Sequence, residues 1–221
     1  MNAVAITARG IEYYRNVFNL TRREVETLNI LDCAAGASTS VSEIHRAGGT
    51  ATAVDASYVD GSDHVQDRVR RNLANAEGWL SKHAEAIDWN ILGSIEQYRH
   101  QMRANLDTFL TDWASHPHRY VGGALPKLPF ADGTFDLALC SNFLFAYPNN
   151  GVQFHQAAVF ELLRVAGEVR IHPLVSGDGG EVEFVDGIVE RTRKAGYQVS
   201  LIEAHNSWLK SADASLHIRH R

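Results

Sequence analysis

Residues 31–38 read LDCAAGAS, Leu31 to Ser38, and this stretch decides how the rest of the chain is interpreted. The run Asn29 to Cys33 is apolar and too short for a helix, so it predicts a buried strand. The residues after it are all small, and small side chains let a backbone approach a ligand closely. Residues 39–47 then place apolar side chains at helical spacing and end at Gly48-Gly49. With a strand over 50–55, the pattern predicts a parallel strand, helix, strand unit.

A helical insertion is predicted over residues 60–118. Apolar side chains recur there every three or four residues, first at Val65, Val69, Leu73, Ala76 and Leu80. A second helix is expected from Ser94, a suitable N-cap, through Trp113. The two helices interrupt the alternation of strands and helices, so we expect them to form one elaboration of a larger fold.

The alternating pattern resumes after the insertion. We expect strands over residues 119–123, 135–141 and 168–174, and helices over 154–165 and 182–195. The last two predicted strands, 198–204 and 215–219, are joined by a turn too short for a crossover helix, so they must pair antiparallel. The sequence therefore predicts an α/β fold: a three-layer, Rossmann-like sheet, mostly parallel with an antiparallel C-terminal strand, plus the helical insertion. We expect residues 1–221 to form a single domain.

Composition argues against several classes of partner and location. The formal net charge of -5 gives no overall basic field for attracting nucleic acid or an anionic membrane. No apolar run approaches the roughly 20 residues of a membrane span, and the N-terminus does not resemble a targeting segment. The two cysteines, Cys33 and Cys140, lie in apolar strand-like runs and are expected to be buried free thiols of a reducing compartment. We therefore expect a cytoplasmic protein without a nucleic-acid or membrane partner.

The turn at residues 34–38 is a candidate ligand site. In an open parallel sheet, ligands bind beyond the carboxyl ends of the strands. Asp55 ends the second predicted strand, where an acid can accept hydrogen bonds from ribose hydroxyls. The same pattern also fits a small-residue turn that only packs a helix on a sheet, so the turn alone leaves both interpretations open.

Three segments together resemble a known family. Leu31 to Gly36 is similar to its first motif, although Ala34 and Ser38 replace two glycines. The stretch LPFADGTFDL, Leu128 to Leu137, is the more specific match, and ELLRV, Glu161 to Val165, is a third. In these segments, and in its antiparallel ending, the chain resembles the class I S-adenosylmethionine-dependent methyltransferases. The resemblance leaves the helical insertion outside it.

The resemblance implies a cofactor, S-adenosylmethionine, and a set of residues around it. Asp32 would lie near the methionine amino group, Asp55 would bind the ribose, and backbone at Ala124 and Leu125 would contact the adenine. The acid that many relatives place before LPF is replaced here by Ala124. The implied cofactor-binding residues are Tyr14, Asp32, Ala34, Gly36, Asp55, Ala56, Ala124, Leu125, Ser141 and Asn142, with Tyr13 beside Tyr14.

Methyl transfer depends mostly on positioning, and it needs a general base only if the acceptor must lose a proton. His172, at the end of a predicted strand, and Tyr147 are the candidate catalytic residues, and His155 is expected to be structural. Asp112, His116 and His118 have metal-like spacing, but Pro117 and the polar surroundings indicate a solvated loop, so no metal is expected.

The preferred hypothesis is a methyltransferase for a small-molecule acceptor, with the insertion as its lid. An apolar stripe on the insertion helices could instead form a homodimer contact. Two alternatives stay open: a catalytically silent S-adenosylmethionine-binding partner protein, and a nicotinamide-dependent oxidoreductase, which the antiparallel ending disfavours.

Overall fold

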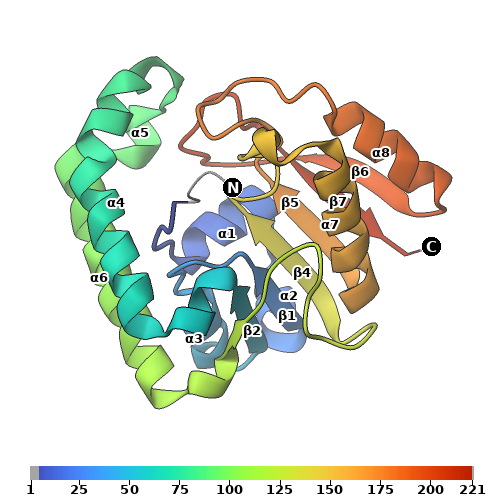
Figure 1. Cartoon of the computed structure of the whole chain (residues 1–221), viewed down its shortest axis with the longest axis horizontal. Coiled ribbons are helices and arrows are strands. Elements are labelled where there is room, and N and C mark those ends of the chain that lie inside the picture. Colours follow the sequence, from blue (N-terminus) through green and yellow to red (C-terminus); the bar gives the residue numbers. More distant parts are fainter. Residues whose placement is uncertain (1–4, 221) are drawn as a thin grey trace.

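One twisted sheet organises the part of the chain that the computed structural model describes, residues 5–220 (Figure 1). Within these residues the sheet has seven strands in the order β3-β2-β1-β4-β5-β7-β6. The strands are β1 (Asn29–Cys33), β2 (Thr50–Asp55), β3 (Tyr120–Gly122), β4 (Phe135–Ser141), β5 (Ala166–His172), β6 (Gln198–Glu203) and β7 (Ala214–Arg219). The predictions for β1, β2 and β4 match these bounds, and β5 ends earlier than expected because Pro173 has no N–H for the ladder.

The strand directions confirm the predicted mixed sheet. β1 pairs in parallel with β2 and β4, and β4 pairs in parallel with β5. β7 runs antiparallel to both of its neighbours, β5 and β6. The two cysteines lie opposite each other in the β1–β4 register, both buried and both free.

Helices cover both faces of the sheet (Figure 1). Ile30 of β1 packs in a core with α1 (Ile11–Phe18), α2 (Arg22–Thr27) and α3 (Ser40–Arg46). Leu31 and Cys33 face the other way, into a core with α7 (Val152–Val165) and α8 (Val185–Lys194). This alternation follows from the two-residue period of a strand and produces the predicted three layers.

The insertion consists of α4 (Ser62–Lys82), α5 (Trp89–Leu92) and α6 (Ile95–Ser115). All five apolar positions predicted for α4 are buried, and α6 starts with a capping box from Ser94. Its tip is bound to the loop between β6 and β7: Ile87 bridges Leu209, and Asp88 N–H donates to the Trp208 carbonyl at 2.9 Å. The insertion is therefore attached to the body at its tip as well as at its base.

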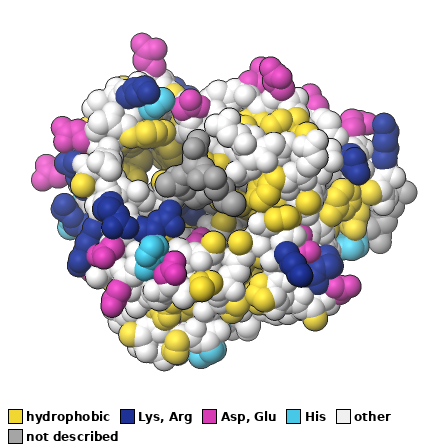
Figure 2. Space-filling model, in the orientation of Figure 1, with side chains coloured by type: hydrophobic (Ala, Val, Ile, Leu, Met, Phe, Trp, Pro, Cys, Tyr) yellow, Lys and Arg dark blue, Asp and Glu magenta, His cyan; other side chains and the backbone are white. Residues whose placement is uncertain are grey.

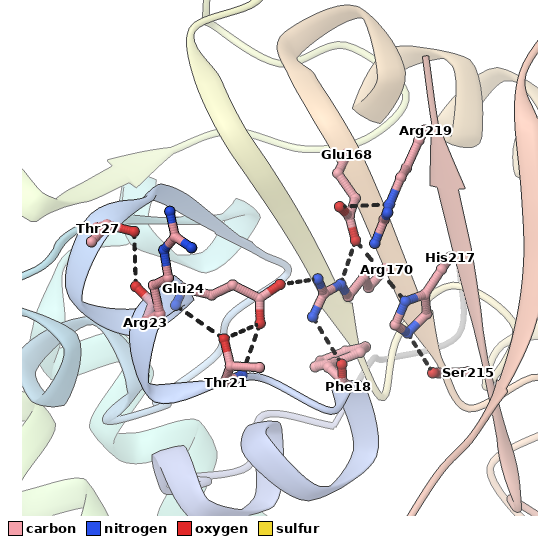
Figure 3. A network of polar contacts seen from close by, with 10 residues as sticks. All are labelled: Phe18, Thr21, Arg23, Glu24, Thr27, Glu168, Arg170, Ser215, His217 and Arg219. Carbon is pink, nitrogen blue, oxygen red and sulfur yellow. Dashed lines mark hydrogen bonds and ion pairs between the residues drawn. The ribbon is translucent and has the colours of Figure 1, made fainter. Parts of the chain in front are cut away.

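A buried ion-pair network fixes α1 and α2 against β5 and β7 (Figure 3). The Arg170 guanidinium is 3% exposed, donates to the Phe18 carbonyl at 3.0 Å and pairs with Glu168 at 2.6 Å and with Glu24. Arg219 also reaches Glu168, at 2.9 Å. A buried charge is tolerated only when it is paired and hydrogen-bonded, and each of these partners comes from a different element of the fold. The network therefore holds the helices on the sheet. No helix among residues 5–220 has the length and hydropathy needed to cross a membrane.

Candidate functional site

The turn after β1 is held in shape by the acid at the end of β2. Ala34 and Gly36 have positive φ angles, 56° and 59°. The Asp55 carboxylate accepts a hydrogen bond from the Gly36 N–H at 3.0 Å, and its other oxygen accepts from Ser57 N–H and Oγ at 2.8 and 2.6 Å. The structure therefore brings together the two residues that the sequence singled out, with Asp55 bonded to the turn itself.

Residues 5–9, here called the N-terminal strap, lie across this turn. The Thr7 carbonyl accepts from the Ala37 N–H at 3.1 Å, and the Arg9 carbonyl accepts from the Thr39 N–H at 2.8 Å. A Cβ atom on Gly36 would lie 3.2 Å from the Thr7 oxygen, so any other residue would press the strap away by a few tenths of an ångström. The turn is consequently buried under the chain's own N-terminal segment.

Arg9 carries a positive charge into the space between the ends of β1 and β4. Its side chain is 8% exposed, and Nη2 donates to the Ser141 carbonyl at 3.3 Å. Nη1 bonds to the Thr7 hydroxyl, whereas the buried Nε has no hydrogen-bond partner among residues 5–220. Asp32 and Tyr14 stabilise the guanidinium electrostatically. This role of Arg9 could not be predicted, because a single arginine before a helix belongs to no periodic pattern or motif.

Asp32 is buried beneath α1 and the start of α3. Its carboxylate accepts from Tyr14 Oη at 3.2 Å and from Ser40 Oγ at 2.5 Å. Burial raises the pKa of Asp32 to about 6, against the opposing effects of the Ser40 hydrogen bond and the Arg9 charge. At pH 7 the carboxyl group is mostly ionised and forms a buried negative site opposite Arg9.

The other half of the candidate site is open to solvent. Ala56 and Ala124 are exposed, whereas Leu125 is buried. The Gly123 N–H donates to the Asp55 carbonyl at 3.2 Å, which places the segment before Leu125 beside the end of β2. The site thus has an open end near Asp55 and a closed end near Arg9.

Polar and aromatic groups gather beyond β4 and β5. Asn142, with a φ of 51°, follows Ser141, and its side-chain oxygen and nitrogen lie 3.2 and 3.0 Å from the Tyr13 hydroxyl. The ring centroids of Tyr13 and His172 are 6.2 Å apart. The structure therefore places Tyr13, Asn142 and the predicted base His172 in one cluster.

His172 is a neutral imidazole in this cluster. Its Nδ1 lies 3.2 Å from the Ala214 carbonyl, and Nε2 lies 3.4 Å from Ser207 Oγ. Burial lowers the pKa of His172 to about 4. A neutral ring can accept a proton, but so low a pKa makes it a weak base at pH 7. Ser207 and Trp208, in the β6–β7 loop, join this region without any sequence motif that could have identified them.

Tyr147, the other candidate, contacts the strap. Its hydroxyl accepts from the Ala5 N–H at 2.9 Å, and its ring lies 6.1 Å from that of Phe143. Burial raises the pKa of Tyr147, so it remains a phenol at neutral pH. His155 is buried in α7, where its Nδ1 lies 2.7 Å from the Gly151 carbonyl and its Nε2 lies 2.8 Å from the Leu144 carbonyl.

The residues with metal-like spacing bond to other groups. Asp112 contacts His116 Nδ1 at 3.0 Å, Arg119 Nη1 at 2.8 Å and the Tyr120 hydroxyl at 2.7 Å. Among residues 5–220, no three or more His, Cys, Asp or Glu side chains are grouped so that they could hold a metal ion.

A groove of about 580 Å³ between α4 and α6 lies apart from these residues. Lys and Arg side chains gather over the two helices in Figure 2. The residues that line the groove are Arg70, Leu73, Ala74, Arg99, Arg103, Leu106 and Asp107. None of them is a predicted site residue.

The topology decides what kind of fold carries this site. Six strands are parallel, and β7 alone is reversed and inserted between β5 and β6. The fold is that of the class I methyltransferases. Among solved structures, TnmH superposes on 96% of this chain and 55% of its own with a TM-score of 0.50 and 13% identity.

Two further proteins are similar to this chain, one in structure and one in sequence. Magnesium protoporphyrin IX methyltransferase from Synechocystis PCC 6803, solved with bound SAM, gives a TM-score of 0.47 at 11% identity, covering 90% of this chain and 73% of that one. In sequence, the chain is 26% identical over 220 residues to Uncharacterized protein MJ0045 of Methanocaldococcus jannaschii, covering 97% of this chain and 95% of that protein. No family model matches the chain.

Proposed function

We propose that this protein is an S-adenosylmethionine-dependent methyltransferase that acts on a small-molecule acceptor. The observation that carries the proposal is the Gly36–Asp55 hydrogen bond of 3.0 Å, which sets a glycine turn and an acid side by side at the carboxyl end of the sheet. This is where open α/β sheets bind nucleotide ligands. The methyltransferase topology and the LPFADGTFDL segment agree with it.

The residues around the turn have the chemistry that this cofactor needs. Asp55 and Ala56 would hold the ribose at the open end, with backbone at Ala124 and Leu125 beside the adenine. Asp32 provides a buried negative charge suited to a cationic amino-acid group, with Ser141 and Asn142 nearby. The bound cofactor supplies a methyl group already activated by its sulfonium. The space for its amino-acid part holds the N-terminal strap in this structure.

The acceptor is proposed to lie beyond β4 and β5, against Tyr13, Asn142, His172 and the loop that carries Ser207 and Trp208. This region combines aromatic surface with hydrogen-bonding groups, as small-molecule sites do. Because His172 is a weak base, the nucleophilic atom of the acceptor should be one that is already deprotonated or that loses its proton to water. The side chains here would position the acceptor and exclude water.

A catalytically silent S-adenosylmethionine-binding protein is the second candidate. The strap favours it, because its carbonyls already bond the turn's Ala37 and Thr39 N–H groups. The two candidates differ in turnover, since both would bind the cofactor.

Titration calorimetry with S-adenosylhomocysteine and with NAD tests both candidates. The methyltransferase proposal expects micromolar binding of S-adenosylhomocysteine that is lost in Asp55→Ala, and transfer of labelled methyl groups to an acceptor mixture. Binding without transfer to any acceptor would favour the silent protein. A preference for NAD, or no binding of S-adenosylhomocysteine, would overturn the proposal.

A further inference from the structure

The N-terminal strap is attached on three sides. The turn donates Ala37 and Thr39 N–H groups to it. The insertion donates two side-chain amides: Asn72 Nδ2 to the Ile6 carbonyl and Asn105 Nδ2 to the Ala8 carbonyl, each at 2.8 Å. On the third side, the Tyr147 hydroxyl and the Ser141 carbonyl accept from Ala5 and Arg9. A segment held by three separate parts of the fold has a defined position in the closed state.

The strap also matches the charge of the space it fills. The Arg9 guanidinium donates to the Ser141 carbonyl and is within the electrostatic influence of the Tyr14 hydroxyl and the Asp32 carboxylate. Its Nε is buried without a partner, so the fit is incomplete. A buried polar atom without a hydrogen bond is costly, so this bound position of Arg9 is less stable than a fully paired one, which favours exchange of Arg9 for another cation.

We propose that the strap is an exchangeable occupant of the cofactor site, in which Arg9 takes the place of the cofactor's cationic amino-acid group beside Asp32. This rests on the proposed function. Binding requires residues 5–9 to leave the Gly36 turn, and the two asparagines of the insertion set how readily they leave. The insertion thereby controls cofactor affinity without contacting the cofactor, through its hold on the strap.

The apparent affinity for the cofactor is the intrinsic affinity multiplied by the fraction of molecules in which the strap is released. Removing one amide that holds the strap raises that fraction. From the usual net strength of a hydrogen bond, Asn72→Ala or Asn105→Ala should each tighten S-adenosylhomocysteine binding about fivefold. The double variant should tighten it about 25-fold if the two contributions add.

Titration calorimetry on the full chain measures these affinities. Asn75→Ala, an exposed asparagine on α4, is the matched control and should leave the affinity unchanged. Tighter binding in the two asparagine variants and not in the control supports the exchange. Equal or weaker binding overturns it while leaving the cofactor assignment intact, and no binding in any of these proteins overturns both.

Trypsin cleavage after Arg9 provides a readout that does not depend on affinity. Arg9 is buried in the closed state, so the Arg9–Gly10 bond should resist the protease. Saturating S-adenosylhomocysteine should speed the loss of the first nine residues severalfold, as followed by mass spectrometry. Protection by the ligand, or an unchanged rate, would show that the strap stays in place and would overturn the exchange.

Discussion

His172 should make the stability of the protein fall as the solution becomes acidic. Burial holds the pKa of His172 at about 4 in the folded chain, against 6.5 as the ordinary value. Below pH 6.5 the unfolded chain therefore binds a proton that the folded chain does not, and each unit of acidification favours unfolding. From the two pKa values, this residue alone should remove about 2 kcal/mol of unfolding free energy between pH 8 and pH 5.

Replacing His172 with glutamine removes the titration and isolates this contribution. His172→Gln costs stability at pH 8, since it disturbs a buried site, but the gap to the wild type should narrow by about 2 kcal/mol at pH 5. Urea unfolding at the two pH values, followed by tryptophan fluorescence and circular dichroism, measures the gap.

His118→Gln is the matched control, because His118 is exposed. The difference in unfolding free energy between His118→Gln and the wild type should be the same at pH 8 and at pH 5. The comparison also removes the effect of His217, whose pKa burial likewise lowers to about 4. If the gap between wild type and His172→Gln is equal at pH 8 and pH 5, then His172 is hydrated or protonated in the folded protein and the reasoning fails.

Three further predictions concern the turn, the network and the buried acid. Gly36→Ala should lower the unfolding free energy by about 1–3 kcal/mol, because it combines a positive φ with a contact to the strap, whereas Ala34→Gly should change it by less than about 1 kcal/mol in urea melts. Arg170→Met should cost about 1–3 kcal/mol, because the Phe18 carbonyl and the partly buried Glu24 lose their guanidinium partner while Glu168 keeps Arg219, against less than about 1 kcal/mol for the exposed Arg193→Met. Burial raises the pKa of Asp32 to about 6, so the folded chain holds a proton that the unfolded chain releases, and the protein loses stability as pH rises through that value. The unfolding free energy of Asp32→Asn, relative to that of the wild type, should therefore rise by about 2 kcal/mol from pH 4.5 to pH 7. Equal losses of unfolding free energy in Gly36→Ala and Ala34→Gly would contradict the first expectation, and equal losses in Arg170→Met and Arg193→Met the second. A difference between Asp32→Asn and the wild type that is the same at both pH values would contradict the third.

Local pattern was sufficient for most of the fold. β1, β2 and β4 could be delimited because each is a short apolar run between turn residues, and α4 because its apolar side chains keep a helical period. α2 was missed, since it has six residues and its main signal is the Thr21–Glu24 capping box. The direction of β7 followed from the length of the loop before it.

Site residues could be predicted only where they lie at the ends of predicted strands, because the sheet then determines where they meet. Asp55 could be placed beside Gly36 because adjacent parallel strands bring their carboxyl ends together. Arg9, Ser207 and Trp208 reach the site from segments without regular structure, whose paths depend on tertiary packing. No periodicity specifies such a path, so the closed strap could be found only in the folded molecule.

The position of β7 has a consequence for synthesis of the chain. β7 follows β5 and β6 along the chain and so leaves the ribosome after them, yet it lies between these two strands in the folded sheet. Until residues 214–219 emerge, β5 has an open edge and β6 has no neighbour within the sheet. The loop that anchors the tip of the insertion, through Trp208 and Leu209, also emerges late. A chain interrupted before residue 214 would therefore lack the strand that joins β5 to β6, and such fragments should be prone to aggregation.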